Sequence, residues 1–425
     1  MTARWHWLAI RLTKRLWFRA SLFSVLGVAT ALLAVVFDGS IPPSLSTRIG
    51  ADAVDNILSI IASSMLAVTT FSLSTMVSAY SAASSGVTPR ATTLVMEDTT
   101  TQNALATFIG SFLFSLVGII ALSTGVYGAE GRAFLFAVTI VVIILIVYTL
   151  LRWIDHLSRL GRVGETIDRV ESAALEALNH RVEWPYLGGS AYPAPLAIPT
   201  DLDFVPSEDT GYIQHIDVQA LGAIATAHQL RIYVEVLPGS FVHMGMHLAK
   251  IDGLPPEADA HADIKGRILQ TLTIGIRRTF EHDPRFGLSV LSEIASRALS
   301  PAVNDPGTAI DVIGRGIRIM TCWGQMHVRS TSEVMPGCER IFLKSLRIYD
   351  LFDDFFGPIS RDGAALMEVN IRLLKALRSL TQINPALFGD VCAVHAANLV
   401  KRSDVKLTLQ YEKDQLVSLA NMIKP

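Results

Sequence analysis

One long apolar segment of the sequence carries a stripe of polar side chains along a single face. When residues 52–85 are wound as an α-helix at about 100° per residue, these side chains fall within roughly a quarter-turn. The residues of the stripe are Asp52, Asn56, Ser59, Ser63, Thr70, Ser74, Ser78, Ser81 and Ser85. No charged residue occurs between Asp55 and Arg90, so the stripe offers hydrogen bonds without a titratable group at depth. Such a face suits a partner helix or water, and it favours passive conduction over pumping.

Three interpretations of the stripe remain open. The hydroxyls could bond back to carbonyls one turn earlier and allow close packing within a bundle. Copies of the helix could instead surround a water-filled path in a homo-oligomer, with Asp52 and Asn56 at the outer mouth. In the third interpretation, the helix shifts in the bilayer and passes this motion to a cytoplasmic domain. The stripe continues to Ser85, beyond the length that a bilayer requires, which favours the second and third interpretations.

A second polar string, EIASRALSPAVNDPGTAID, runs from Glu293 to Asp311. A helix should end near Leu299, because Pro301 disfavours helical geometry at the residue before it. The favoured interpretation is a capped helix–turn–helix, and a polar pocket or an oligomer contact is the alternative. In the first interpretation Asp305 caps a helix that begins at Pro306, and Asn304 takes the left-handed geometry of the reversal. The polar residues of this motif are Ser300, Asn304, Asp305, Thr308, Glu293 and Arg297.

Charged residues are also dense just upstream, in the string RRTFEHDPR between Arg277 and Arg285. An ion-pair network between surface helices is the simpler interpretation. A regulatory anion or nucleotide site is the alternative, although no phosphate-binding glycine motif supports a nucleotide.

Other candidate chemistry is weaker. His243 and His247 fall on one face of an expected strand, with His215 nearby in sequence, but no acidic or cysteine ligand completes a metal set. The three cysteines match no metal or redox spacing. No nucleophile elbow or zinc-protease helix occurs. We therefore expect no metal and no cofactor, and the sequence leans away from an enzyme.

The composition is typical of a membrane protein. Mean hydropathy is +0.40, half of the residues are hydrophobic and 17% are charged. A net charge of −2 gives no basic field for nucleic acid. Four spans of about 20 residues can be drawn, at 17–37, 54–80, 103–124 and 133–151. The last span is apolar on every side, so we expect it to face lipid.

Basic residues near the span ends set the expected orientation. One side carries Arg4, Arg11, Lys14, Arg15 and Arg19, joined by Arg90, Arg152, Arg159 and Arg162, whereas the other has only Arg48 and Arg132. We therefore expect a multi-pass inner-membrane protein with both termini cytoplasmic. No convincing cleavage site follows the first span, so it is expected to be an uncleaved anchor.

The remainder of the chain is expected to be a cytoplasmic α+β region. Residues 156–206 should form a helix and a Pro/Gly-rich linker without helical or strand period, after a transmembrane domain of residues 1–155. Residues 207–252 alternate as β-strands and suggest a small barrel-like module, without the lysine that would carry biotin or lipoate. Residues 253–425 should form an α-rich domain. Its expected helices are Ala260–Phe280, Pro284–Ala298, Pro306–Val328, Arg340–Phe355, Asp362–Gln382, Pro385–Leu399 and Lys413–Met422.

Several of these strings resemble a known family. RALSPAVNDPGTA, RRTFEHDPRFGLSVLSEIA and GYIQHID…PGSFVHMG are similar to those of bacterial predicted membrane proteins catalogued as domain of unknown function 2254. The resemblance covers nearly the whole chain and implies an inner-membrane protein with a cytoplasmic domain. The family brings no established activity, so the resemblance indicates class and not function.

Together these features predict a homo-oligomeric channel-like or passive transport protein in the lipid bilayer. The segment at 54–80 would line a path for a small ion or solute, gated by the cytoplasmic region. The alternative is a membrane-anchored sensor or scaffold that does not conduct.

Overall fold

The computed structural model describes residues 16–36, 51–96, 98–124, 129–194, 198–199, 202–329 and 337–423 of the 425-residue chain. Its described residues form two compact units, an N-terminal unit that ends at Thr166 and a C-terminal unit that begins at Ile167. Several of the basic residues on which the expected orientation depends lie outside the described residues. They are Arg4, Arg11, Lys14, Arg15 and Arg48.

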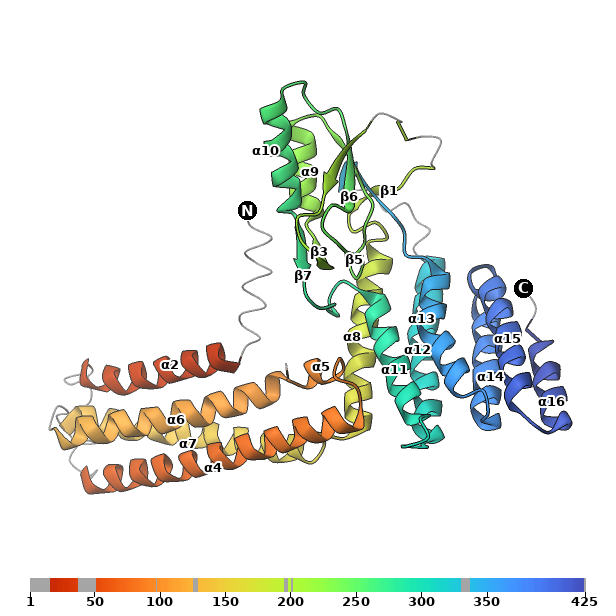
Figure 1. Cartoon of the computed structure of the whole chain (residues 1–425). Coiled ribbons are helices and arrows are strands. Elements are labelled where there is room, and N and C mark those ends of the chain that lie inside the picture. The colour runs from red at the N-terminus through yellow and green to blue at the C-terminus, as the bar shows by residue number, and fades with distance from the viewer. Residues whose placement is uncertain are drawn as a thin grey trace. The chain divides into compact units, whose positions relative to one another are not determined.

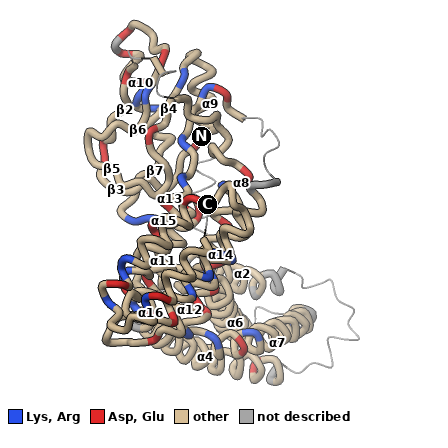
Figure 2. The backbone as a smooth tube through the Cα atoms, turned by 90° about the vertical axis from the view of Figure 1, so that its right-hand side faces the viewer, with Lys and Arg blue, Asp and Glu red and all other residues tan. Residues whose placement is uncertain are grey.

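The N-terminal unit consists of long apolar helices that run alongside one another (Figure 1). Its core is filled by large apolar side chains, including Leu58, Phe108, Phe114, Leu135 and Trp153. Figure 2 shows how few charged residues these helices carry compared with the C-terminal unit. The helices are α2 (Leu16–Val36), α4 (Ala51–Gly86), the short α5 (Thr92–Met96), α6 (Thr99–Ser123) and α7 (Ala129–Leu157).

Within the described residues, three helical stretches are long and apolar enough to cross a membrane. They are Ala53–Ser84, Thr92–Ser123 and Gly131–Leu157, which overlap the spans predicted at 54–80, 103–124 and 133–151. The span predicted at 17–37 coincides with α2, a helix of 21 residues in which Ala20–Thr30 forms a shorter apolar stretch. A fourth crossing therefore stays a prediction.

The C-terminal unit contains two open sheets. A five-stranded sheet has the order β1-β8-β4-β6-β2, and a three-stranded sheet has the order β5-β3-β7. Buried aliphatic side chains such as Ile232, Leu248 and Ile341 form the core of this region, with α9 (Val218–Ala227) and α10 (Ala258–Leu269) beside it. The strands are β1 (Gly189–Ala191), β2 (Asp203–Pro206), β3 (Gly211–Ile216), β4 (Arg231–Val234), β5 (Phe241–Val242), β6 (His247–Asp252), β7 (Leu272–Gly275) and β8 (Cys338–Leu343).

This architecture corrects the prediction of a small barrel-like module at 207–252. The described strands close no barrel, because those of this segment are divided between the two open sheets. Within the larger sheet, β4 pairs in parallel with β8, which comes about a hundred residues later in the chain. The segment expected to be a structureless linker supplies β1 and β2. The helix expected at 260–280 ends at Leu269 and gives way to β7. The first residues of the helix expected at 340–355 belong to β8, where Ile341 and Leu343 are buried in the sheet.

Several of the other helices of the C-terminal unit pack around a cluster of buried phenylalanines. Phe352, Phe355 and Phe356 of α13 lie at its centre, and the hydroxyl of Ser292 on α11 donates to the carbonyl of Asp354 at 2.8 Å. The helices are α8 (Val163–Glu183), whose first turn precedes the unit, α11 (Pro284–Ala298), α12 (Pro306–Arg329), α13 (Ile348–Asp362), α14 (Met367–Ile383), α15 (Pro385–Lys406) and α16 (Gln410–Ala420).

Candidate functional site

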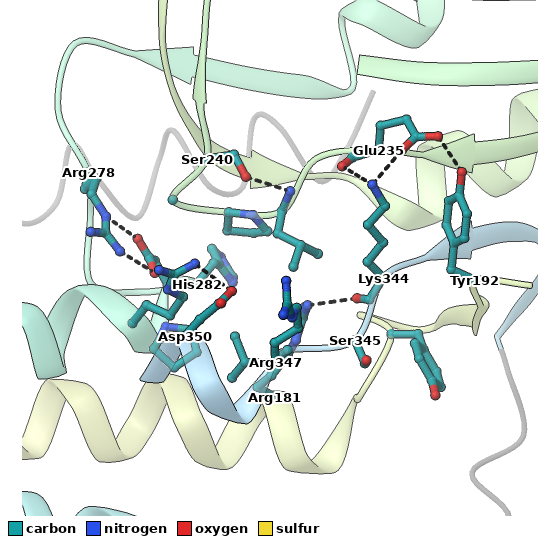
Figure 3. Close-up of a pocket in the computed structure, with 18 of the residues that line it drawn as sticks. Arg181, Tyr192, Glu235, Ser240, Arg278, His282, Lys344, Ser345, Arg347 and Asp350 are labelled. Carbon is teal, nitrogen blue, oxygen red and sulfur yellow. Dashed lines mark hydrogen bonds and ion pairs between the residues drawn. The ribbon is translucent and has the colours of Figure 1, made fainter. Parts of the chain in front are cut away.

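The C-terminal unit has a cavity of about 630 Å³ where both sheets meet the helix starts of α11 and α13 (Figure 3). Its wall comes from separated segments of the chain: the end of α8, the strand β1, the loop after β4 and the residues that precede α11 and α13. Five cationic side chains, from Arg181, Arg278, Arg285, Lys344 and Arg347, line it with three acidic ones, from Glu235, Asp283 and Asp350. The site is therefore both concave and basic.

Asp283 links one side of the cavity to the start of α11. Its carboxylate accepts two hydrogen bonds from Arg278, at 2.7 and 3.0 Å, and also accepts from the backbone N–H of Phe286 at 3.2 Å. Burial raises the pKa of Asp283, while Arg278 and the helix N–H act in the opposite direction. The residue serves as helix cap and counter-charge together.

Arg285 joins α11 to α13. Its guanidinium donates to Asp354 at 2.7 Å and to Asp350 at 3.0 Å. Asp350 is thus already paired, although it lies in the wall of the cavity.

Glu235 anchors the opposite side. Its carboxylate meets the ammonium of Lys250 at 2.9 Å and that of Lys344 at 2.5 Å, and it accepts a hydrogen bond from the hydroxyl of Tyr192. Burial alone would raise the pKa of Glu235, but the hydrogen bonds from Lys250, Lys344 and Tyr192 outweigh it and hold the pKa at about 2. The carboxylate is ionised throughout the physiological range.

We expect Glu235→Gln to lower the stability of the C-terminal unit by about 1–3 kcal/mol at neutral pH. The folded pKa of about 2 lies below the ordinary value of 4.5. The stabilisation from ionised Glu235 is therefore present above pH 4.5 and is lost as pH falls toward 2. Unfolding temperatures of wild type and variant should differ at neutral pH and converge only as pH falls to about 2. An equal difference at both pH values would contradict the assigned ion pairs.

Arg181 is the most buried cation of the cavity, with 6% of its surface exposed. Its Nη2 donates to the carbonyl of Lys344 at 3.3 Å, whereas Nε and Nη1 have no hydrogen-bond partner within the described residues. Burial lowers the pKa of Arg181 to about 10, and Asp283 acts in the opposite direction. The guanidinium therefore stays charged at neutral pH.

Arg347 lies at the start of α13, where it occupies the N-cap position. Arginine has no acceptor, and the helix has no side-chain cap there. Ser345 and Leu346, which precede it, also line the cavity. The amino end of α13 therefore presents N–H groups and a cationic side chain to the same space.

His282 lies between this cavity and a second hollow lined by His180 and His215. The ring of His282 is centred 4.8 Å from that of His215 and 5.8 Å from that of His180. Burial, followed by the neighbouring His215 and His180, lowers the pKa of His282 to about 4. At neutral pH His282 is uncharged and adds no positive charge to the cavity.

The other predicted histidines lie apart from this cluster. His247 stacks on Phe204 at 4.1 Å, and the Nδ1 atom of His243 lies 2.9 Å from the carbonyl oxygen of Met244. Across the described residues, no group of three or more potential metal ligands forms.

The structure places the predicted polar stripe on the surface of the N-terminal unit. The side chains of Asp52 and Ser85 lie outside the described residues. The others, Asn56, Ser59, Ser63, Thr70, Ser74, Ser78 and Ser81, are all exposed. The buried face of α4 lies opposite and is apolar except for Ser72, with Val54, Leu58, Ile61, Met65 and Met76. Among the described residues, the stripe therefore does not pack against the other helices of the N-terminal unit.

Two hydroxyls of the stripe bond back to their own helix. Ser63 donates to the carbonyl of Ser59 and Thr70 donates to that of Leu66, both at 2.9 Å. These bonds satisfy the donors even where no partner helix is present.

The SPAVNDP segment forms a capped turn between α11 and α12. Asp305 accepts hydrogen bonds from the backbone N–H of Thr308 at 3.0 Å and from its hydroxyl at 2.6 Å, and Asn304 has a left-handed φ of 51°. Ser300 donates to the carbonyl of Arg297 at 2.7 Å. Glu293 lies one turn before Arg297 on α11. The polar contacts of Ser300, Asp305 and Thr308 described here are local.

The cavity matches the sequence-based expectations only in part. Arg278, His282, Asp283 and Arg285 come from the charged string that allowed a regulatory anion site, and they do line it. Sequence reasoning missed the residues from distant segments, namely Arg181, Tyr192, Glu235, Lys344 and Arg347. Arg181 had one usable signal, since it continues the apolar stripe of α8 three residues after Leu178.

A buried pair in the N-terminal unit was also missed. At the amino end of α6, the carboxylate of Asp98 lies 2.7 Å from the Nε2 atom of His156 near the end of α7. Asp98 also accepts hydrogen bonds from Thr101, and the Trp153 ring, which stacks on His156, donates to Ser72 at 2.9 Å. This network joins α4, α6 and α7 at one end of the bundle.

These observations define a membrane protein that combines an apolar helical unit with an α/β unit. The chain belongs to the family of predicted membrane proteins designated DUF2254, whose model matches residues 13–379. Uncharacterised proteins of Mycobacterium bovis and Mycobacterium tuberculosis are each 29% identical to it over 237 residues, which cover 54% of this chain and 45% of theirs. The chain thus spans less than half the length of these relatives. No solved structure matches it.

Proposed function

We propose that this protein is a multi-pass inner-membrane protein, with four spans and cytoplasmic termini, that forms a homo-oligomeric passive path for a small ion or solute. In this proposal α4 of each subunit faces the path, and the C-terminal unit regulates it from the cytoplasm. The observation that carries the proposal is the exposure of the α4 stripe on the surface of its own helical unit.

The arrangement of α4 favours an assembly over a lone chain. Apolar residues cover the face that packs inside the subunit, while the hydroxyls and Asn56 point away from it. In a lone chain this polar face would meet lipid, which offers no hydrogen bonds. Four long helices are also too few to enclose a path, so conduction requires several copies. Around a shared axis, the stripes of these copies would wet a common centre.

The back-bonded hydroxyls support a competing function. Because Ser63 and Thr70 satisfy their donors within α4, the helix can also face lipid. The protein would then be a membrane-anchored sensor or scaffold, and its function would lie in the C-terminal unit.

Ion flux through purified protein in liposomes tests the path. We expect Ser63→Leu and Ser74→Leu to reduce flux by tenfold or more, because a leucine side chain dewets a narrow constriction. Ser64→Leu is the matched control. Ser64 is also exposed and bonds back to Ile60 at 2.6 Å, but it lies about 100° around the helix from Ser63.

Thiol labelling separates a wet face from a lipid face even if the path is closed. Cys322, Cys338 and Cys392 all belong to the C-terminal unit and can be replaced by serine beforehand. A cysteine at position 63 or 74 should then react with a charged thiol reagent, whereas one at position 64 should not. Inert cysteines at 63 and 74, together with flux that ignores the leucine variants, would contradict the path and leave the sensor or scaffold.

A further inference from the structure

We propose that the cavity of the C-terminal unit binds a small organic phosphate, with the phosphoryl group at the amino end of α13 beside Ser345 and Arg347. The buried guanidinium of Arg181 would supply positive charge to the phosphoryl group. The organic part would contact the aromatic residues that line the cavity, Tyr186, Tyr192 and Phe241. All residues that line this cavity belong to the C-terminal unit, so the inference does not depend on a path along α4.

The balance of charge in the cavity calls for an anion. Its wall holds five cationic side chains and three acidic ones. Each acid already meets a cation, since Arg278 binds Asp283, Arg285 binds Asp350 and Lys344 binds Glu235. Two residues outside the wall also take part in these ion pairs: Lys250 binds Glu235, and Asp354 binds Arg285. Their opposite charges cancel, so the net charge of the site does not change. Arg181 and Arg347 are left without a carboxylate in any ion pair described here.

Arg181 gives the strongest single argument. A guanidinium that is 6% exposed, with two nitrogen atoms unpartnered within the described residues, is unfavourable unless a counter-charge is supplied. Asp283 is the acid that acts on it electrostatically, and this carboxylate is already held by two hydrogen bonds from Arg278. An anion in the cavity would supply the missing negative charge.

The amino end of α13 gives a second and independent argument. This helix of 15 residues starts without a side-chain cap, and its start lines the cavity. The first N–H groups of a helix and its dipole together favour an anion. Ser345 and Arg347 are both exposed here, so a hydroxyl and a guanidinium line the cavity beside the start of this helix.

The charge and the size of the site indicate the class of ligand. Two unbalanced positive charges match a phosphate monoester, which carries about −1.5 to −2 at neutral pH. A volume of about 630 Å³ is that of a small-molecule site and far exceeds one inorganic ion. Tyr186, Tyr192 and Phe241 form part of its wall and offer ring faces or edges to an organic group.

A purely structural role for Arg181 is the competing explanation. The residue lies in the last turn of α8, where a positive charge interacts favourably with the helix dipole, and it bonds to the carbonyl of Lys344. This explanation accounts for one of the two unbalanced cations. It does not account for Arg347 at the opposite, positive end of another helix.

Isothermal titration calorimetry on the full chain in a phosphate-free detergent buffer tests the site. The phosphate probes are inorganic phosphate, ribose 5-phosphate and AMP, and the comparators are adenosine and succinate. We expect at least one organic phosphate to bind with one-to-one stoichiometry, more tightly than inorganic phosphate, and adenosine not to bind. Arg347→Ala should weaken binding by roughly tenfold to a hundredfold through the loss of a charge-assisted hydrogen bond.

Arg181→Met separates the ligand role from the structural one. If Arg181 serves the ligand, the variant should lose at least tenfold in affinity, and the unfolding temperature of the unliganded protein should not fall. Arg372→Met, on the exposed face of α14, is the matched control and should change neither quantity. Because Arg347 is exposed, Arg347→Ala keeps the test decisive even if Arg181→Met fails to fold.

Four results would overturn the proposal. The first is that no phosphate probe binds the wild type, and the second is that Arg347→Ala and a folded Arg181→Met bind as tightly as the wild type. If succinate is the only probe that binds, the ligand is a dicarboxylate and not an organic phosphate. Displacement of AMP by phosphatidylglycerol vesicles would show that the site binds the phosphate of a lipid headgroup. It would overturn the proposal that the ligand is a small, free organic phosphate.

Discussion

Replacement of Gly316 by leucine is expected to disrupt the helical part of the C-terminal unit, with a loss of about 3 kcal/mol or more in stability. Gly316 lies on α12 where the helix meets the ring of Phe355, and even a Cβ atom at this position would overlap the ring. Phe355 is fully buried and is enclosed by its neighbours on α13. Neither the ring nor the helix can move aside without opening the phenylalanine cluster.

A second glycine on the same helix provides the control for this prediction. A Cβ at Gly314 would meet nothing within 4 Å, so Gly314→Leu should be neutral or stabilise α12 by up to about 1 kcal/mol through helix propensity. Fluorescence of Trp323, which lies on α12 beside Phe388, reports unfolding of this region. Equal unfolding temperatures for the two variants would contradict the close contact between Gly316 and the ring of Phe355.

The starts of α11, α12 and α15 could be predicted because their signals are local. Asp283 and Asn384 each accept a hydrogen bond from an N–H three residues later and precede a proline, which fixes where α11 and α15 begin. Asp305 marks α12 in the same way. Caps and prolines act within one turn of chain, so they can be read without the tertiary structure.

The sheet could not be predicted because its pairing is not local. β4 lies between β6, reached through a nearby turn, and β8, which pairs in parallel from about a hundred residues away. In the sequence, β8 is a short run in which Ile341 and Leu343 alternate with polar or partly exposed residues. Such a run fits the start of a helix equally well, and only the pairing with Ile232 and Val234 resolves it.

The candidate site follows the same division. Arg278 to Arg285 are close in sequence, and their charge density marked them as a possible anion site. Arg181 lies on α8, whereas Glu235 and Lys344 directly follow β4 and β8, so nothing in their spacing along the chain relates them. Among these three residues, only Arg181 could have been noticed from the sequence. It places a charge on the apolar face of an amphipathic helix, which departs from the pattern of that helix.

The α4 stripe was correctly located in sequence, but its direction required the structure. Helical periodicity fixes which residues share a face and leaves open whether that face points into the bundle or out of it. The buried set from Val54 to Met76 now places the stripe outward. Packing against the other described helices of the N-terminal unit therefore does not explain the stripe, and contact with lipid or with a second copy stays a proposal.

Replacement of Gly110 by leucine is expected to separate α2 from α6 in the N-terminal unit. A Cβ at Gly110 would lie 3.0 Å from the carbonyl oxygen of Phe23, and one at Gly27 would lie 2.7 Å from the carbonyl oxygen of Gly110. The two backbones touch at this crossing, as small residues allow in membrane bundles. Because the leucine side chain would meet backbone atoms and not a flexible side chain, we expect the stability of the N-terminal unit to fall by about 2 kcal/mol or more.

Hydrogen exchange of α2 measures this separation directly in the full chain in detergent. Gly110→Leu should speed exchange in peptides from Leu16–Val36 while leaving the C-terminal unit unchanged. Ala137→Leu adds similar bulk to an exposed face of α7 and should leave α2 protected. Protection of α2 that survives Gly110→Leu would show that α2 does not depend on α6. The two helices would then not form the close pair that a four-span bundle requires.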